Sequence, residues 1–238
     1  MPLDASAHAW GWLALSGLVG FVFGDYFLFR AYALISSRIA MLVMTLVPPI
    51  TALIGWLWLG EIMKAKELAG MFLTVGGIAM AIFNRPNNGR RIKLSYPMKG
   101  LLFAFGGTVG QAGGLVLSKY GMQDYNAFAA TQIRIIAAII GFALVILLLG
   151  KTYLIRNAFR DKKGLFGIGG GSFFGPFLGV SFSLIAVQYT TTGVAATLMA
   201  MTPVFLILPS RFVFRQRITV LEVAGAFVSV VGVSLFFW

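Results

Sequence analysis

The chain has 238 residues, of which 59% are hydrophobic and 11% are charged, and its formal net charge is +12 at pH 7. A soluble domain is roughly half apolar and about a quarter charged, so this composition excludes an ordinary soluble protein. Cysteine is absent and His8 is the single histidine, which excludes disulfides and leaves no Cys or His metal ligand within the apolar segments.

Apolar runs recur along the chain, and each is long enough to cross about 30 Å of hydrocarbon as a helix. No lysine or arginine precedes the first run, so a signal peptide is not predicted. The polar linkers at 84–97 and 151–163 are too short to form a soluble domain. The sequence therefore predicts an all-α integral membrane bundle of eight helices, at 11–34, 39–59, 67–83, 98–118, 127–150, 164–188, 193–214 and 218–237.

Lysine and arginine are distributed unevenly between the two sides of this bundle. Arg30 and Arg134 lie within predicted helices, and Lys64, Lys66 and Lys119 lie on the side of the second-to-third and fourth-to-fifth connections. The other fourteen of the 19 basic residues lie on the opposite side. By the positive-inside rule that opposite side is cytoplasmic, and both ends of this chain lie outside. Short basic loops thus account for the net charge, and we expect no nucleic-acid partner.

An internal repeat relates the two halves of the chain. A shift of 155 residues places 17–83 on 172–238 without a gap, with 14 identities in 67 pairs. Corresponding helices are five crossings apart, so they run in opposite directions, as in the inverted-topology repeats of many secondary transporters. Two helices, 98–118 and 127–150, lead the second copy without a counterpart in the first. We therefore expect a ten-helix protein that has lost two helices ahead of residue 1.

The motifs of this repeat resemble the EamA family of the drug/metabolite transporter superfamily. They are VPPITALIGWLWLGE (47–61) and ELAGMFLTVGGIAMAIF (67–83), with MTPVFLILPSRFVFRQ and EVAGAFVSVVGVSLFF in the second copy. The chain departs from the family at Gln216, where the family has glutamate, and in the two missing helices. The family arrangement has both ends in the cytoplasm, which would place the start of this chain inside, against the distribution of its basic residues.

The resemblance implies two EamA-type repeats, at 1–85 without its leading helices and at 98–238, joined by a linker at 86–97. It also implies a secondary transporter in the inner membrane of a prokaryotic cell, which exports small metabolites such as amino acids or related compounds. The expected partners are a small-molecule substrate and the lipid bilayer, with a homodimer as a further option.

Small residues and prolines form regular patterns within the predicted helices. Glycines at four-residue spacing let helices approach closely in lipid, so we expect packing contacts, and these smooth faces could also be sliding surfaces. Prolines lie within the second and seventh predicted helices, where a proline bends a helix and predicts either a hinge or gate or a static kink. The packing residues are Gly20, Gly24, Gly106, Gly110, Gly114, Gly171, Gly175 and Gly179, and the hinge residues are Pro48, Pro49, Pro203 and Pro209.

Polar residues that occur in only one copy of the repeat cannot be required by the shared fold. Asp25 lies near the middle of its helix and aligns with Val180, and Arg30 is near enough to the helix end to reach the interface. The two are about 140° apart around the helix, so Asp25 needs a partner elsewhere, for which Arg134 is one candidate. The alternative to a functional site is a structural clamp or a protonated aspartate. The candidate substrate or proton pathway comprises Asp25, Arg30, Gln111, Gln132, Arg134, Ser181, Ser183 and Gln188.

These observations favour a secondary transporter that works by alternating access. The alternatives are a non-transporting membrane interaction or sensor protein and a membrane-embedded enzyme. An enzyme would need a nucleophile with a base or clustered carboxylates, and Asp25 is the single acidic residue deep within a predicted helix. The glycine-rich run at 164–175 follows no predicted strand, so it does not indicate a dinucleotide site. We therefore expect no enzymatic activity, no cofactor and no metal.

Overall fold

The computed structural model of the chain describes residues 4–35, 37–83, 97–150, 152–153, 161–205 and 220–237. Within these ranges every regular element is a helix. Five of the described helices are long and apolar enough to cross a membrane: Ala7–Leu34, Ile39–Leu59, Met98–Met122, Ala127–Leu148 and Gly164–Tyr189. The structure is therefore a bundle of membrane helices, as expected.

The first membrane helix changes its winding along its length. α1 (Ala7–Gly17) begins after Ser6, whose Oγ accepts a hydrogen bond from the backbone N–H of Ala9 at 3.1 Å and caps the helix. The chain continues through the π-helical segment η1 (Leu18–Asp25) into α2 (Tyr26–Leu34). The helix thus starts at Ala7 rather than at the predicted residue 11, because the serine cap lies further upstream.

The second predicted helix, 39–59, is interrupted rather than bent. α3 (Ser37–Met44) ends before a turn at Thr45 and Leu46, and α4 (Val47–Ile54) starts afresh and continues into the π-helical segment η2 (Gly55–Leu59). Pro48 and Pro49 lie in the first turn of α4, where a missing N–H breaks no helical hydrogen bond. These prolines therefore lie directly after a break in the spanning helix, and their role as a hinge or gate stays a prediction.

The remaining elements follow the predicted order, with α6 extending four residues beyond the predicted end at 118. Pro203 lies in a short helix that starts after a turn at Met201, whereas Pro209, Gln216 and residues 86–96 of the linker lie outside the described ranges. These elements are α5 (Ala65–Phe83), α6 (Met98–Met122), α7 (Ala127–Leu148), α9 (Lys162–Ser172), η3 (Phe173–Gly179), α10 (Val180–Tyr189), α11 (Thr192–Ala200), α12 (Thr202–Phe205) and α14 (Val220–Ser234).

The element boundaries follow the internal repeat closely. A shift of 155 residues carries the bounds of α1 onto those of α9, and it carries the first residue of η1 onto the first residue of η3. The same shift carries Leu46, where the chain breaks before α4, onto Met201, where it breaks before α12. The two parts of the chain thus share helix winding and helix breaks as well as sequence.

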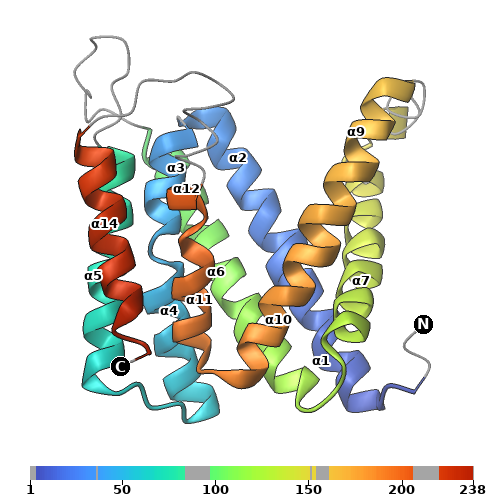
Figure 1. Cartoon of the computed structure of the whole chain (residues 1–238). Helices are drawn as coiled ribbons and strands as arrows, with labels where there is room; N and C mark the ends of the chain where they lie inside the picture. Colours follow the sequence, from blue (N-terminus) through green and yellow to red (C-terminus); the bar gives the residue numbers. More distant parts are fainter. Residues whose placement is uncertain are drawn as a thin grey trace.

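α5 and α14 lie side by side and run in opposite directions (Figure 1). Thr74 Oγ1 lies 3.4 Å from the carbonyl oxygen of Ser229, and Ser229 Oγ lies 3.3 Å from the carbonyl oxygen of Thr74. The Ser229 hydroxyl has its shorter hydrogen bond, at 2.8 Å, to the carbonyl oxygen of Gly225 in its own helix. These two residues correspond under the 155-residue shift, so the contact is reciprocal, as it is across a two-fold axis. Two glycine contacts flank this pair, since Gly70 contacts Gly232 and Gly77 contacts Gly225. The 155-residue shift relates one of these contacts to the other.

The helices form two groups with α6 crossing between them (Figure 1). α3, α4, α5, α11, α12 and α14 lie on one side of α6, and α1, α2, α7, α9 and α10 lie on the other. α2 and α9 diverge toward the end of the bundle where α2 ends and α9 begins, and the chain converges toward the α10–α11 connection.

The turn between α6 and α7 contains a strained residue, since Gln123 has φ 46° and ψ −120°, a conformation that suits glycine. The side-chain amide of Gln188 holds this turn by donating to the carbonyl oxygens of Gln123 at 3.2 Å and Tyr125 at 2.8 Å.

The strained backbone at Gln123 costs about 1–3 kcal/mol. We expect Gln123→Gly to raise the melting temperature in detergent, whereas Gln123→Ala, which retains the strain, should not. Equal melting temperatures for both variants would contradict strain at this turn.

Candidate functional site

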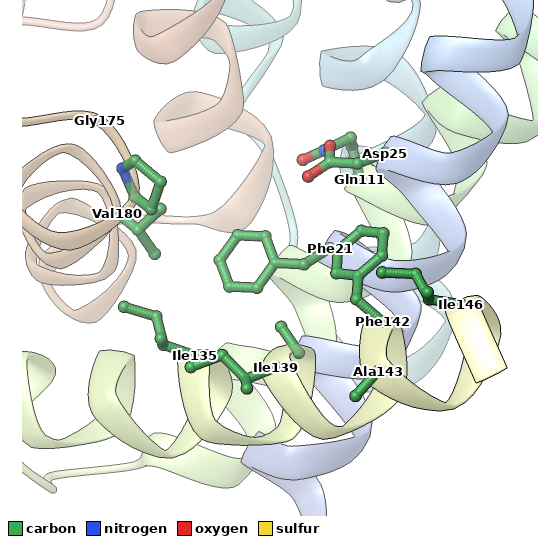
Figure 2. A pocket seen from close by; sticks show the side chains of 12 residues that line it. Phe21, Asp25, Gln111, Ile135, Ile139, Phe142, Ala143, Ile146, Gly175 and Val180 are labelled. Atoms are coloured by element: carbon green, nitrogen blue, oxygen red, sulfur yellow. The ribbon is translucent and has the colours of Figure 1, made fainter. Parts of the chain in front are cut away.

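A cavity of about 670 Å³ lies among η1, α6, α7 and η3 and the start of α10 (Figure 2). A volume of this size is typical of small-molecule sites. Most of its wall is apolar, and two of the lining side chains, Asp25 and Gln111, are polar. The lining residues are Phe21, Asp25, Gln111, Ile135, Ala138, Ile139, Phe142, Ala143, Ile146, Gly175, Pro176 and Val180.

Asp25 and Gln111 form a hydrogen-bonded pair at the cavity wall. The side-chain amide of Gln111 donates to Asp25 Oδ1 at 2.8 Å and also lies 3.5 Å from the carbonyl oxygen of Gly20. Both side chains are half-buried, and Figure 2 shows them together at one edge of the cavity. A carboxylate can accept about four hydrogen bonds, so the bond from Gln111 leaves acceptor sites for a ligand or a proton.

Asp25 is positioned by the π-helical segment that ends at this residue. A π-helical turn re-aims the side chains around it and occurs often at functional sites. The second copy has a π-helical segment at the corresponding place, η3, which contains Pro176 and also lines the cavity. The two segments thus face the cavity from different helices.

Close contact between η1 and α6 brings Gln111 within reach of Asp25. A Cβ added to Gly114 would lie 2.5 Å from the Cα of Gly20, and a Cβ added to Gly110 would lie 2.7 Å from the Cα of Gly24. Such an approach of two backbones requires glycine at the contact. These four glycines therefore form the helix contact that places the hydrogen-bonded pair.

The other glycines singled out in the sequence have different surroundings. A Cβ on Gly106 would meet the ring of Phe27 at 3.2 Å, whereas a Cβ on Gly171 or Gly175 would have no atom of the described residues within 4 Å. Gly179 approaches only Phe174 of its own helix, at 3.4 Å from the carbonyl oxygen. The interhelical packing expected for the second-copy glycines is therefore absent among the described residues, because α9 and η3 diverge from the rest of the bundle.

Arg134 is buried behind the cavity wall, with 5% of its surface exposed. Its guanidinium carbon lies 4.7 Å from the centre of the Phe21 ring, and its Nε has no hydrogen-bond partner in the part of the chain that the structure describes. Within the described residues Arg134 forms no direct ion pair with Asp25, although their opposite charges attract at longer range. The direct partner of Asp25 is Gln111, which replaces the Arg134 pairing considered from the sequence.

Arg30 lies away from the cavity. It is exposed, and its Nη2 donates to the hydroxyl of Tyr26 at 2.9 Å while the guanidinium lies 5.2 Å from the centre of the same ring. The two residues are four apart on one helix and therefore share a face. This arrangement suits a residue at the membrane interface.

The remaining polar candidates do not line the cavity either. Ser181 is fully buried, and its hydroxyl has no hydrogen-bond partner among the described residues. The half-buried Ser183 donates to the carbonyl oxygen of Gly179 at 2.8 Å. Gln132 is half-buried, and Gln188 holds the α6–α7 turn. The structure thus brings together two of the eight polar candidates at the cavity.

The apolar wall could not be recognised from the sequence. Phe21, Ile139 and Phe142 have the same residue types as the lipid-facing side chains around them. Pro176 is the single sequence signal on the η3 side, since a proline within a membrane helix often accompanies an irregular turn that faces a cavity.

Similar proteins were found among curated sequences and solved structures. An uncharacterized transporter of Archaeoglobus fulgidus is 30% identical over 115 residues, which is 48% of this chain and 39% of that protein. The chain thus aligns with about two fifths of this relative's length. A solved crystal structure superposes with a TM-score of 0.74 at 18% identity and covers 94% of this chain and 75% of its own. At this identity the likeness shows a shared fold.

The family model described as the EamA-like transporter family matches residues 2–83 and 98–238, which is nearly the whole chain. The match includes every residue that lines the cavity. The apolar helices agree with the membrane location of such a transporter. The chain is therefore an integral membrane protein that belongs to the EamA-like transporter family.

Proposed function

We propose that this protein is a secondary transporter that exports small metabolites such as amino acids or related compounds by alternating access through the cavity at Asp25. The supporting observation is a carboxylate, held by Gln111, at the wall of an otherwise apolar cavity within membrane-spanning helices. A charge in the membrane interior is costly, and such residues usually face a bundle interior and mark a substrate or ion pathway. Asp25 is therefore the central residue of the proposed pathway.

The charges around the cavity suit a zwitterion. Asp25 offers carboxylate oxygens to an ammonium group, and Arg134 is a buried guanidinium whose Nε lacks a hydrogen-bond partner among the described residues. The ring of Phe21 lies over this guanidinium and lines the cavity, so a movement of the ring would expose the positive charge to a substrate carboxylate. The apolar wall would then accommodate the side chain of an amino acid.

Alternating access is supported by the reciprocal contacts of α5 and α14. Thr74 and Ser229 meet their own counterparts, which is what an inverted repeat predicts for helices on its two-fold axis. Two copies of one fold in opposite orientations can each adopt the conformation of the other. This exchange of conformations opens the cavity first to one side of the membrane and then to the other. The helix breaks before Pro48 and Pro203 occur at matched positions, and we propose them as the hinges of this exchange.

We propose export because the end of the bundle at which α2 and α9 diverge would face the cytoplasm (Figure 1). In the sequence, the basic segments precede α6 and α9, so the positive-inside rule makes this end cytoplasmic. A cavity that opens there can load from the cytoplasm, as an exporter requires. The archaeal relative agrees with a prokaryotic cell membrane.

Flux measured with the purified chain in proteoliposomes tests this proposal. We expect saturable movement of a labelled apolar amino acid, above that in protein-free vesicles. An excess of another zwitterion should compete, whereas the corresponding amine without a carboxylate should not. Thermal stabilisation by amino acids without any flux would overturn the transport proposal in favour of a sensor.

A further inference from the structure

A polar cluster lies near the end of the bundle where the chain converges. Glu61 Oε1 is 2.7 Å from Lys119 Nζ, an ion pair without hydrogen-bond geometry. The other carboxylate oxygen accepts hydrogen bonds from the backbone N–H of Thr192 at 2.8 Å and from its hydroxyl at 2.6 Å. Lys119 also donates to the carbonyl oxygen of Thr190 at 2.5 Å. We call Glu61, Lys119 and Thr192 the end cluster.

The end cluster joins the two halves of the chain. Glu61 follows η2 in the first copy, Lys119 lies in the last turn of α6, and Thr192 is the first residue of α11. The carboxylate of Glu61 therefore caps the start of a helix from the other half, where the helix dipole favours a negative charge. Separation of these elements would break the ion pair and the cap together.

The surrounding backbone is shaped around the Glu61 carboxylate. A Cβ on Gly55 would lie 2.7 Å from Glu61 Oε2 and would also overlap the hydroxyl of Thr192. Gly60 has φ 66°, the left-handed conformation that turns the chain back toward α11 after η2. The side chains of Glu61 and Lys119 are 12% and 26% exposed, so the pair is largely shielded from water. These features distinguish the end cluster from a chance surface ion pair.

The repeat indicates that the fold does not require the negative charge of Glu61. The counterpart of Glu61 under the 155-residue shift is Gln216, which carries no charge. The shared architecture therefore has no need of a carboxylate at this place. In the sequence, one copy of the repeat thus has a glutamate at this position and the other copy has a glutamine.

We propose that the end cluster is a latch that holds shut the end of the path opposite the cavity opening, and that it separates when the cavity becomes accessible from that end. This inference rests on the proposed alternating access. The cavity reaches along α7 from Ile135 to Ile146, toward the diverging end, so the latch and the opening lie at opposite ends. Loss of the ion pair removes an attraction present only in the shut state, and the population shifts toward the other state.

Cysteine accessibility measures this shift directly, because the chain has no cysteine of its own. Ala143 lines the cavity, and Ala143→Cys provides a single thiol there. A membrane-impermeant maleimide is added to either side of sealed vesicles that contain the full chain. We expect rapid labelling from the cavity side, and we expect Glu61→Gln or Lys119→Gln to raise the rate from the opposite side at least fivefold.

Glu67→Gln is the matched control, since Glu67 Oε2 accepts a hydrogen bond from the backbone N–H of Lys64 near the same end but lies outside the end cluster. Its labelling rates should equal those of the parent Ala143→Cys chain. Unchanged opposite-side labelling in both folded variants would overturn the latch. If neither variant folds, Glu61→Asp decides, because the shorter side chain keeps its charge but draws it away from Lys119, and it should also raise opposite-side labelling.

The labelling experiment needs no substrate, so it can reject the latch without rejecting the transport proposal. A shift in labelling without amino-acid flux supports the latch and rejects the proposed transport. Flux with unchanged labelling rejects the latch and retains the transport.

Discussion

Asp25→Asn is expected to abolish substrate flux in proteoliposomes while the protein stays folded. Asparagine has nearly the size of aspartate, and its side-chain oxygen can still accept the hydrogen bond from Gln111. The variant lacks the negative charge that the proposed ammonium binding or proton transfer uses. We expect flux to fall by at least about 100-fold, which corresponds to about 2.7 kcal/mol, with the melting temperature within a few degrees of the parent.

Asp124→Asn is the matched control for this experiment. Asp124 is exposed in the turn after α6, outside the cavity lining, and the substitution removes the same charge. Its flux should equal that of the parent protein. Normal flux through Asp25→Asn would show that the carboxylate is a structural clamp, and a large fall in its melting temperature would lead to the same conclusion.

The number of helices and the repeat could be read from the sequence because they depend on local chemistry. A membrane helix needs a long apolar run, and such runs are visible in one chain. The repeat is visible because both copies conserve the small residues at their tightest contacts, such as Gly77 and Gly232. Helix winding was not predictable, since the composition of η1 is as apolar as that of the α-helices on either side.

The partner of Asp25 could not be predicted because it depends on register between helices. The sequence places Asp25, Gln111 and Arg134 at similar depths in three helices but does not say which of them face one another. Contacts between glycines of η1 and α6 set that register and bring Gln111 to Asp25. The sequence predicts these contacts as helix packing, whereas their consequence for the site depends on the three-dimensional arrangement of the helices.

The end cluster shows a different limit of the sequence. Glu61 ends a motif that carries the family resemblance, yet its spacing from Lys119 and Thr192 gives no sign of contact. Its partners lie on α6 and at the start of α11, far along the chain, and the helix cap exists only once those elements have packed. Chemistry that forms between helix ends is therefore the part of this protein least accessible to sequence reasoning.

The α5–α14 contact allows a stability experiment with an internal control. A Cβ on Gly77 would lie 2.6 Å from both the carbonyl oxygen of Gly225 and the backbone nitrogen of Ser229, which cannot move without displacing α14. At the adjacent Gly76, a Cβ would have no atom of the described ranges within 4 Å. We expect Gly77→Ala to destabilise the protein by about 1–3 kcal/mol through overpacking, whereas Gly76→Ala should be neutral or mildly stabilising.

The counterpart of Gly77 in the second copy, Gly232, extends this experiment to the proposed symmetry. A Cβ on Gly232 would lie 2.6 Å from the backbone nitrogen of Thr74 and 2.8 Å from the carbonyl oxygen of Gly70. The 155-residue shift thus relates the residues around Gly77 to those around Gly232. The alanine variants of the two glycines should therefore lower the melting temperature by similar amounts. A loss confined to one of the two would show that the helices do not pack about a two-fold axis, and the structural support for an inverted repeat would then rest on the element boundaries alone.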